Sequence, residues 1–306
     1  MKRGLLRNLF RSFVSGTLAL VSVTGGTEEL KGLDERVSSL SRNSSYRLVD
    51  STPLFFDTHH PQGMTVVDGK IYLTTVDAID RSQGTGVGYL FEVDMSGKLL
   101  RSIELGEGAM YHPGGIDFDG KYIWVSVAEY RPDSSSIIYR VNPKTMAAEE
   151  MFRFDDHLGG IVSLADSRLV VGVSWGSRTF YRWKMNKSGR PVDVQHPVVQ
   201  KNGSHFIDYQ DGQWVRGTSL MLFGGLAGYR SDGQDGASVA AGGLALVNAD
   251  TLRAEFEVPV SLYSERGRVM NQNPFYVESS EKGLTLYFIP DDNRSVLYTY
   301  SVRMRR

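Results

Sequence analysis

Four of the six histidines in this chain stand at the same place in an internal repeat. The five copies of the repeat begin at His60, His112, His157, His205 and Asn273, so the last copy has an amide where the others have an imidazole. Histidine is the side chain whose charge changes near neutral pH, and its neutral ring is also a common metal ligand. The repeated histidines therefore predict either acid–base chemistry or metal binding.

Loops with charged or aromatic residues begin at nearly the same distance after four of these five positions, the exception being His205. Consecutive strands of a repeat run antiparallel, so the start of the first strand and the end of the second meet at one face. Asp77 and Glu129 are predicted there as acid and base, with Arg178 as a third catalytic residue. The predicted substrate-binding residues are Trp175, Arg266, Arg268, Asn273 and Asp291.

The metal hypothesis names His60, His112, His157 and His205 as ligands of a divalent cation. Imidazole with nearby carboxylates suits Zn, Mn, Fe or Ni. Two other interpretations stay open: a polar pocket without metal, and histidines that only bond the backbone. No nucleotide cofactor is expected, because the glycine-rich stretch Gly84–Gly88 is not followed by a helical pattern.

The elements that position these residues are short strands. One repeat reads as Gly115–Phe118, Tyr122–Val127, Ser136–Val141 and Met151–Phe154, separated by turn residues such as Asp119-Gly120. Alternating apolar residues at this spacing, without helical periodicity, are typical of all-β proteins. Four-stranded repeats of roughly 40–50 residues are typical of propeller blades.

The last repeat holds only three strand patterns before the chain ends at Arg306. The segment from Tyr46–Val49 to Leu54–Phe56 can supply the missing outer strand, and this pairing leaves no open edge. The sequence thus predicts one all-β domain over residues 46–306, a five-bladed β-propeller closed by an N-terminal strand. Six blades is the alternative, because the interval from His205 to Asn273 is long.

The N-terminal residues resemble an export signal. Four basic residues precede the apolar stretch Phe13–Val23, which is shorter than the ~20 residues that cross a bilayer. We expect a signal-like leader over residues 1–26, a polar linker over residues 27–45, and no transmembrane span. The predicted location is secreted or periplasmic, and a cytoplasmic leader is the alternative.

Composition limits the partners. The 306-residue chain has a net charge of −1, so no nucleic-acid partner is expected. It has no cysteine, which excludes disulfides and thiolate metal sites. We expect a monomer that binds a small molecule or a glycan.

The stretch His60–Met64, Lys70–Leu73, Leu90–Asp94 and Gly97–Leu100 resembles the plant-type glutaminyl cyclases, which are five-bladed propellers. Thr74 and Thr75 stand where that family has a glutamate after its second strand. The multiple-histidine pattern resembles the oligogalacturonate lyases, seven-bladed propellers that hold manganese in their channel. The chain as a whole is similar to uncharacterised bacterial and fungal β-propeller proteins.

These observations predict a secreted propeller with a histidine-rich pocket on one face of its central channel. The leading hypothesis is a metal-assisted lyase or hydrolase that acts on a carbohydrate-like small molecule. The alternative is a non-catalytic propeller that binds a ligand or a protein and whose histidines are structural.

Overall fold

The computed structural model describes residues 32–230 and 238–303, and these residues form an all-β fold, as predicted. They contain twenty strands, one α-helix and two short 3-10 helices. The predicted leader over residues 1–26 lies outside the described residues. No helix within the described ranges is long and apolar enough to cross a membrane.

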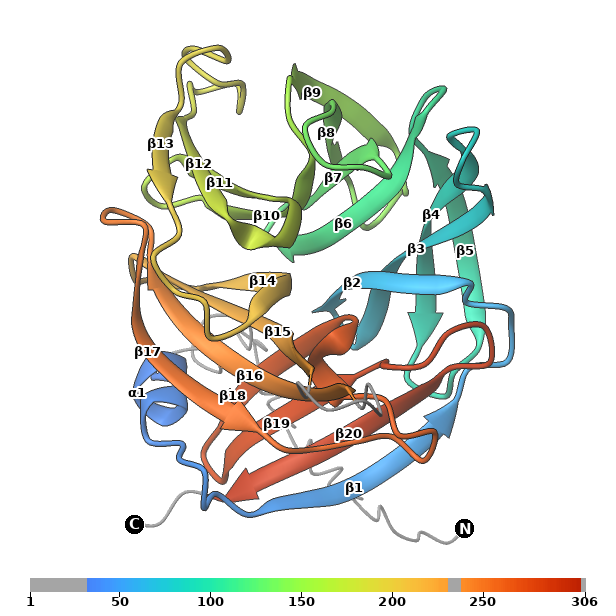
Figure 1. The fold of residues 1–306 in the computed structure, drawn as a ribbon, viewed down its shortest axis with the longest axis vertical. Helices are drawn as coiled ribbons and strands as arrows, with labels where there is room; N and C mark the ends of the chain where they lie inside the picture. The colour runs from blue at the N-terminus through green and yellow to red at the C-terminus, as the bar shows by residue number, and fades with distance from the viewer. Residues whose placement is uncertain (1–31, 231–237, 304–306) are drawn as a thin grey trace, which may run out of the picture.

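The strands form five four-stranded antiparallel units around a common centre, in a propeller-like arrangement (Figure 1). Unit 1 comprises β2 (His60–Val67), β3 (Lys70–Asp80), β4 (Thr85–Asp94) and β5 (Leu99–Leu105). Unit 2 comprises β6 (Met110–Phe118), β7 (Ile123–Glu129), β8 (Ser136–Val141) and β9 (Ala148–Phe154). Unit 3 comprises β10 (Leu158–Leu164), β11 (Leu169–Ser174), β12 (Thr179–Lys184) and β13 (Val198–Lys201). Unit 4 comprises β14 (Asp208–Val215), β15 (Leu220–Arg230), β16 (Ser238–Asn248) and β17 (Arg253–Val260).

Unit 5 joins the two ends of the described chain. It comprises β18 (Phe275–Ser280), β19 (Gly283–Phe288), β20 (Val296–Arg303) and, at its outer edge, β1 (Tyr46–Pro53). β1 runs antiparallel to β20, with Tyr46 opposite Val302 and Pro53 opposite Val296. This is the pairing that the sequence predicted for the N-terminal strand.

The inner strands approach each other backbone to backbone. A Cβ atom on Gly63 would lie 2.7 Å from the Gly114 carbonyl oxygen, and one on Gly114 would lie 2.3 Å from the Gly159 carbonyl oxygen. β6 and β10 meet at a single parallel pair, Gly115 with Gly160, which joins units 2 and 3 into one eight-stranded sheet. Only glycine permits so close an approach, so the repeated glycines after the histidines serve packing.

Two buried carboxylates connect inner strands of different units. The Asp211 carboxylate on β14 accepts N–H bonds from Met64 (2.8 Å) on β2 and Ile116 (2.9 Å) on β6. Asp117 on β6 accepts N–H bonds from Ser163 (3.0 Å) on β10 and Trp214 (3.2 Å) on β14. Burial raises the pKa of Asp117 to about 7, although these bonds oppose the shift. The centre of the fold is thus held by side-chain-to-backbone bonds between units.

Part of the predicted linker packs against the domain. Residues 33–38 form α1 (Leu33–Ser38), which contacts β18 and β19. Leu33, Val37 and Leu40 are buried in the same apolar cluster as Phe288 and Val302 of unit 5. Their spacing places them on one side of a helix, a signal that the sequence carried.

Candidate functional site

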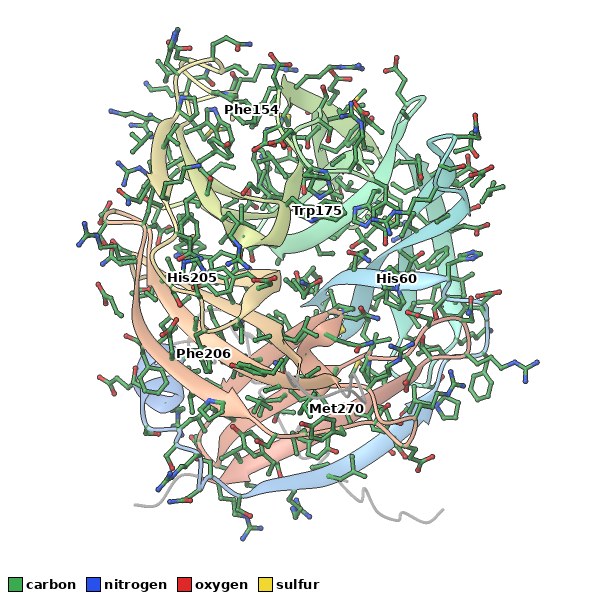
Figure 2. The ribbon with its side chains drawn as sticks, viewed as in Figure 1. His60, Phe154, Trp175, His205, Phe206 and Met270 are labelled. Carbon is green, nitrogen blue, oxygen red and sulfur yellow. The ribbon has the colours of Figure 1, made fainter. Side chains whose placement is uncertain are left out.

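The repeated histidines lie at the beginnings of the inner strands or just before them. His60 begins β2, His112 lies in β6, and His157 immediately precedes β10. His205 lies in the loop before β14, well apart from His60 (Figure 2). The repeat therefore fixes where each histidine lies within its own unit, but not the distance between the rings.

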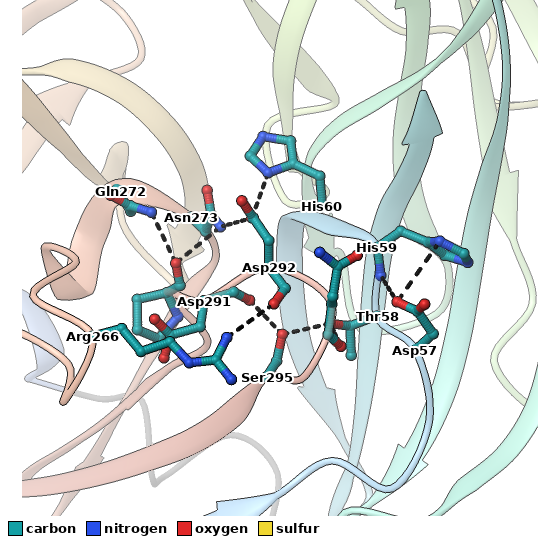
Figure 3. A network of polar contacts seen from close by, with 12 residues as sticks. Asp57, Thr58, His59, His60, Arg266, Gln272, Asn273, Asp291, Asp292 and Ser295 are labelled. Carbon is teal, nitrogen blue, oxygen red and sulfur yellow. Dashed lines mark hydrogen bonds and ion pairs between the residues drawn. The ribbon is translucent and has the colours of Figure 1, made fainter. Parts of the chain in front are cut away.

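His60 is paired with a carboxylate of unit 5. Its Nδ1 atom lies 2.7 Å from Oδ1 of Asp292 (Figure 3). Asn273 donates its side-chain N–H to the same oxygen at 3.3 Å, and the Arg266 guanidinium bonds the Asp292 carbonyl at 3.3 Å. Burial raises the pKa of Asp292, but the hydrogen bond and charge of His60 outweigh it and lower the pKa overall. An ionised Asp292 holds the proton on Nδ1 of His60 and leaves the lone pair on Nε2.

A pocket of about 450 Å³ opens beside this pair. Its lining residues are His59, His60, Val76, Asp77, Ala78, Arg81, Tyr130, Asp292 and Asn293. His59 and Asn293 both have positive φ angles, +50° and +60°, which side-chain-bearing residues adopt rarely. The Asn293 N–H donates to the His59 carbonyl at 2.6 Å, which fixes the two strained residues against each other. Strain of this kind is typical of functional sites.

Two further imidazoles lie side by side in the interior. The ring centroids of His112 and His157 are 5.5 Å apart, and the side chains are 6% and 2% exposed. Burial, with the nearby His157, His60 and Arg81, lowers the pKa of His112 well below its ordinary value. Burial also lowers the pKa of His157, partly offset by a 2.7 Å bond from its Nδ1 to the Glu129 carbonyl. Both rings are therefore neutral at neutral pH, and Nδ1 of buried His112 has no hydrogen-bond partner among the residues that the structure describes.

Tyr130 covers His112 and is itself covered by Arg81. The His112 ring stacks on Tyr130 with centroids 4.0 Å apart, and Cζ of Arg81 lies 3.8 Å from the Tyr130 centroid. Two groups this close to one centroid cannot share a face, so they occupy opposite faces of the ring. Trp175 extends the cluster, with its ring 4.7 Å from His157 and 6.0 Å from Tyr130. Trp175 thus lies on the predicted face and packs against histidine.

The four predicted metal ligands do not form one ligand set. Within the part of the chain that the structure describes, no three His, Asp or Glu side chains are grouped to hold a metal ion. His205 contacts Arg178 instead, at 3.2 Å from its Nδ1, and Arg178 pairs with Asp208. The reason is geometric. Each histidine belongs to the inner strand of a different unit, or to the loop before it, so equal positions in the repeat do not bring the four rings to one point.

The predicted catalytic residues are also separated. Asp77 lines the pocket, where its carboxylate lies 3.8 Å from Nδ1 of His59. Glu129 forms an ion pair with Arg131 at 2.8 Å, and its carbonyl holds His157. Arg178 lies with Asp208 and His205, as described above, away from the pocket lining.

The predicted binding residues of unit 5 lie behind the pocket. Asp291 is buried and accepts a hydrogen bond from the Ser264 hydroxyl at 2.9 Å. The next residue, Asp292, lines the pocket instead of Asp291. Asn273 and Arg266 support Asp292, and Arg268 lowers the pKa of Asp292 by its charge. None of these four lines the pocket itself.

Sequence reasoning missed His59, Arg81, Tyr130 and Asp292. His59 falls outside the histidine register, so the repeat gives no signal for it. Arg81 and Tyr130 belong to loops that follow the second strands, and a search of both loops for aromatic–cation pairs would have found them. For Asp292 the sequence offered two adjacent aspartates and no signal to choose between them.

The buried histidines predict a dependence of stability on pH. A histidine whose pKa is lowered in the folded state takes up its proton more readily in the unfolded state. Its contribution to the free energy of unfolding is therefore complete above the unfolded-state pKa and decreases as the pH falls below that value. We expect the stability advantage of the wild type over His112→Gln to shrink by about 1.4 kcal/mol per pH unit below about pH 6.5. Urea unfolding at several pH values measures this difference in the free energy of unfolding. His196→Gln, at an exposed histidine, is the control. Parallel curves for wild type and His112→Gln would contradict a neutral buried His112.

Comparison with solved structures shows likeness of fold. A hypothetical protein from Leishmania major is 12% identical and matches over 83% of this chain and 90% of that chain, with a TM-score of 0.52. A mannose phosphorylase from Leishmania mexicana is 11% identical over 88% of this chain and 92% of that chain, with a TM-score of 0.48. The WD40 domain of Neurospora crassa Pan2 is 10% identical over 87% of this chain and 98% of that chain, with a TM-score of 0.44. At these identities no activity is carried over.

The sequence comparisons give a family and no activity. No curated protein matches the chain. The local resemblance to glutaminyl cyclases stays a prediction. One family model matches residues 28–305, which include α1 and every strand described above. The chain therefore belongs to the DUF6454 family, a family of unknown function.

Proposed function

We propose that the protein is a five-bladed propeller whose histidine-bearing face holds an acid–base pocket. The five four-stranded units and the pairing of β1 with β20 support the blade count. The proposed ligand is a carbohydrate-like small molecule, and the proposed reaction is elimination or hydrolysis. Export from the cytoplasm is part of the proposal and depends on the N-terminal sequence pattern alone.

The contact between His60 and Asp292 carries the proposal. A histidine oriented by a carboxylate, with its second nitrogen free beside a pocket, is the usual form of a general base. His60 Nδ1 lies 2.7 Å from Asp292, and both residues line the pocket. Nε2 of His60 would remove the proton from a substrate hydroxyl, a substrate carbon or water.

An ionised carboxylate lines this pocket, and neutral imidazoles lie behind its Tyr130 wall. The lowered pKa values of His112 and His157 keep these rings neutral, whereas the lowered pKa of Asp292 keeps this carboxylate ionised. Environments that separate titrating groups in this way are typical of acid–base sites. Arg81, Tyr130 and Asp77 supply the polar contacts that orient a ligand beside His60.

The test is turnover of a panel of oligosaccharides. Hydrolysis is detected by the release of reducing ends, and elimination by the ultraviolet absorbance of unsaturated products. We expect His60→Asn to lower turnover on the order of a hundredfold or more, because general-base catalysis contributes that much. Asp292→Asn should lower turnover less and alter its pH profile, since it removes the orienting charge. The exposed His196→Asn is the control, and a His60→Asn variant as active as the wild type would refute the proposal.

His205→Asn and elemental analysis separate this mechanism from the four-histidine metal hypothesis. The acid–base pocket predicts full activity of His205→Asn, because His205 is paired with Arg178 outside the pocket. The metal hypothesis predicts near-stoichiometric metal in the purified protein, and its loss together with activity in the same variant.

A binding propeller with structural histidines is the second candidate, favoured by the bond between His157 and the Glu129 carbonyl. That 2.7 Å contact uses the ring to hold the end of β7 and satisfies a buried polar group, as a structural histidine does. This alternative predicts that His157→Asn is destabilised but that no oligosaccharide is turned over. Retained binding without turnover would support it.

A further inference from the structure

We propose that Arg81 is the anion-binding residue of this pocket and that the ligand carries a carboxylate or phosphate group. The inference rests on the proposed pocket beside His60 and names the chemical class of its ligand. It assigns the anion-binding role to an arginine that the structure brings to the pocket. The sequence named three other arginines for the site: Arg178, Arg266 and Arg268.

The backbone at Arg81 is fixed by a tight turn between β3 and β4. Oδ1 of Asp80 accepts the N–H groups of Ser82 (2.9 Å) and Gln83 (3.2 Å). The Gly84 N–H donates to the Arg81 carbonyl at 3.3 Å, and Gly84 has a positive φ of 64°. Arg81 therefore projects from a defined turn of unit 1 rather than from an irregular loop.

The Arg81 side chain crosses from unit 1 to unit 2. Its guanidinium lies over Tyr130 at 3.8 Å from the ring centroid, and its Cζ lies 5.8 Å from the centre of the Trp175 ring. Contact with an aromatic face occupies the flat side of a guanidinium and leaves its N–H groups, which lie in the guanidinium plane, free to donate. The stacking orients the group without using its hydrogen-bond donors.

Arg81 is the one charged residue of the pocket lining without a polar partner among the described residues. Asp292 is bonded to His60, and Asp77 lies 3.8 Å from His59. The nearest carboxylate in sequence, Asp80, is engaged by its own turn. The guanidinium on Tyr130 has neither a hydrogen bond nor an ion pair to the described residues.

The other arginines considered for this site are either engaged or outside the pocket lining. Arg178 pairs with Asp208, and Arg131 pairs with Glu129. Arg266 donates to the Asp292 carbonyl at 3.3 Å, and Arg268 does not line the pocket. Arg81 alone combines a free guanidinium with a place in the lining.

A guanidinium with free N–H donors matches planar carboxylates and phosphate oxygens, which accept two parallel bonds. Such a contact fixes one end of the ligand over Tyr130 and places the adjoining part of the molecule toward His60. The pocket holds about 450 Å³, enough for a small acid or a phosphorylated sugar rather than an inorganic ion alone.

The experiment is a calorimetric titration of the whole protein with sodium phosphate and, separately, with sodium acetate and sodium citrate, at constant ionic strength. We expect saturable binding of at least one probe at millimolar concentration, and about tenfold or greater loss of affinity in Arg81→Gln. Arg81→Lys keeps the charge but loses the two parallel N–H donors of the guanidinium. Its affinity should therefore lie between that of Arg81→Gln and that of the wild type. Phosphate and carboxylate probes in separate arms show which group the site selects.

Trp175 reports where the probe binds. The three other tryptophans, Trp124, Trp183 and Trp214, are 3%, 1% and 5% exposed, so a probe on Arg81 should change the Trp175 fluorescence first. The change should disappear in Trp175→Phe, which identifies Trp175 as the source of the signal. Arg131→Gln is the matched control, because Arg131 lies on the same face but is already paired with Glu129.

Two results would overturn the inference: no saturable binding of any probe to the wild type, or the same affinity in Arg81→Gln as in the wild type. The His60→Asn variant separates this outcome from that of the proposed function. Anion binding that needs Arg81 and survives in His60→Asn supports the inference even if the oligosaccharide panel shows no turnover. Turnover that needs His60 without Arg81-dependent binding supports the proposed function alone.

Discussion

Replacing Asp211 with alanine should destabilise the protein by about 3–5 kcal/mol, the largest effect that we expect from a single substitution. The residue is 2% exposed and its carboxylate accepts N–H bonds from Met64, Ile116 and Gly212 at 2.8–2.9 Å. A fourth, longer contact of 3.4 Å comes from the Phe275 N–H. Alanine would leave these buried donors without an acceptor, and each such group is costly.

The effect should be large because the donors belong to several units. Met64 lies in β2, Ile116 in β6 and Phe275 in β18, so one side chain connects the inner strands of units 1, 2, 4 and 5. Burial raises the pKa of Asp211 well above its ordinary value, and the four N–H bonds oppose that shift. The pattern of donors is nevertheless suited to a carboxylate, which accepts bonds on both oxygens.

Equilibrium unfolding in urea measures the loss, provided that the slope with denaturant is unchanged. Asp211→Asn distinguishes the loss of hydrogen bonds from the loss of side-chain volume. It keeps the shape of the side chain but turns one acceptor into a donor, so it should also be destabilised. Exposed Asp250→Ala is the control and should change stability by less than about 0.5 kcal/mol. An Asp211→Ala variant within about 1 kcal/mol of the wild type would show that the centre does not depend on this carboxylate.

The second large effect is expected at Glu92, where Glu92→Ala should destabilise the protein by about 3 kcal/mol. The Glu92 carboxylate on β4 is buried and pairs with Lys70 at 2.7 Å and with Arg101. Arg101 also donates to the carbonyl oxygens of Pro143 (2.8 Å) and Lys144 (2.9 Å) in unit 2. Removal of Glu92 would release the side chain that holds units 1 and 2 together at this point.

The size of this effect is limited because Lys70 and Arg101 are partly exposed and can return to water. The hydrogen bond from Arg101 lowers the pKa of Glu92, and burial opposes it. The contribution of Glu92 is therefore present above the ordinary glutamate pKa and lost as the pH falls through the lowered value. Exposed Glu104→Ala on β5 is the control. Equal stability of Glu92→Ala and Glu104→Ala at neutral pH would contradict the role of the network.

The site was only partly predictable. The repeat register placed His60 and Asp77 beside one pocket, because the start of a first strand and the end of a second strand share a face. It did not identify Asp292 as the partner of His60. The two aspartates lie in the connection between β19 and β20, where no strand alternation shows which one faces the pocket. Asp291 is buried against Ser264, whereas Asp292 lines the pocket. Nor did it identify Arg81, whose partner Tyr130 belongs to another unit.

The sequence by itself determined the all-β fold, the order of the strands and the pairing of β1 with β20. These follow from local signals: alternation along each strand, turn residues between strands, and a last repeat that lacks its outer strand. The tertiary structure alone decided which imidazoles lie together. His112 and His157 became a buried pair, whereas His205 joined Arg178 and Asp208. The reason is that a repeat fixes the position of a residue within its own unit, whereas distances between units depend on how closely the inner strands pack. Here glycine contacts such as Gly63 against Gly114, and the bonds to Asp211, set that packing.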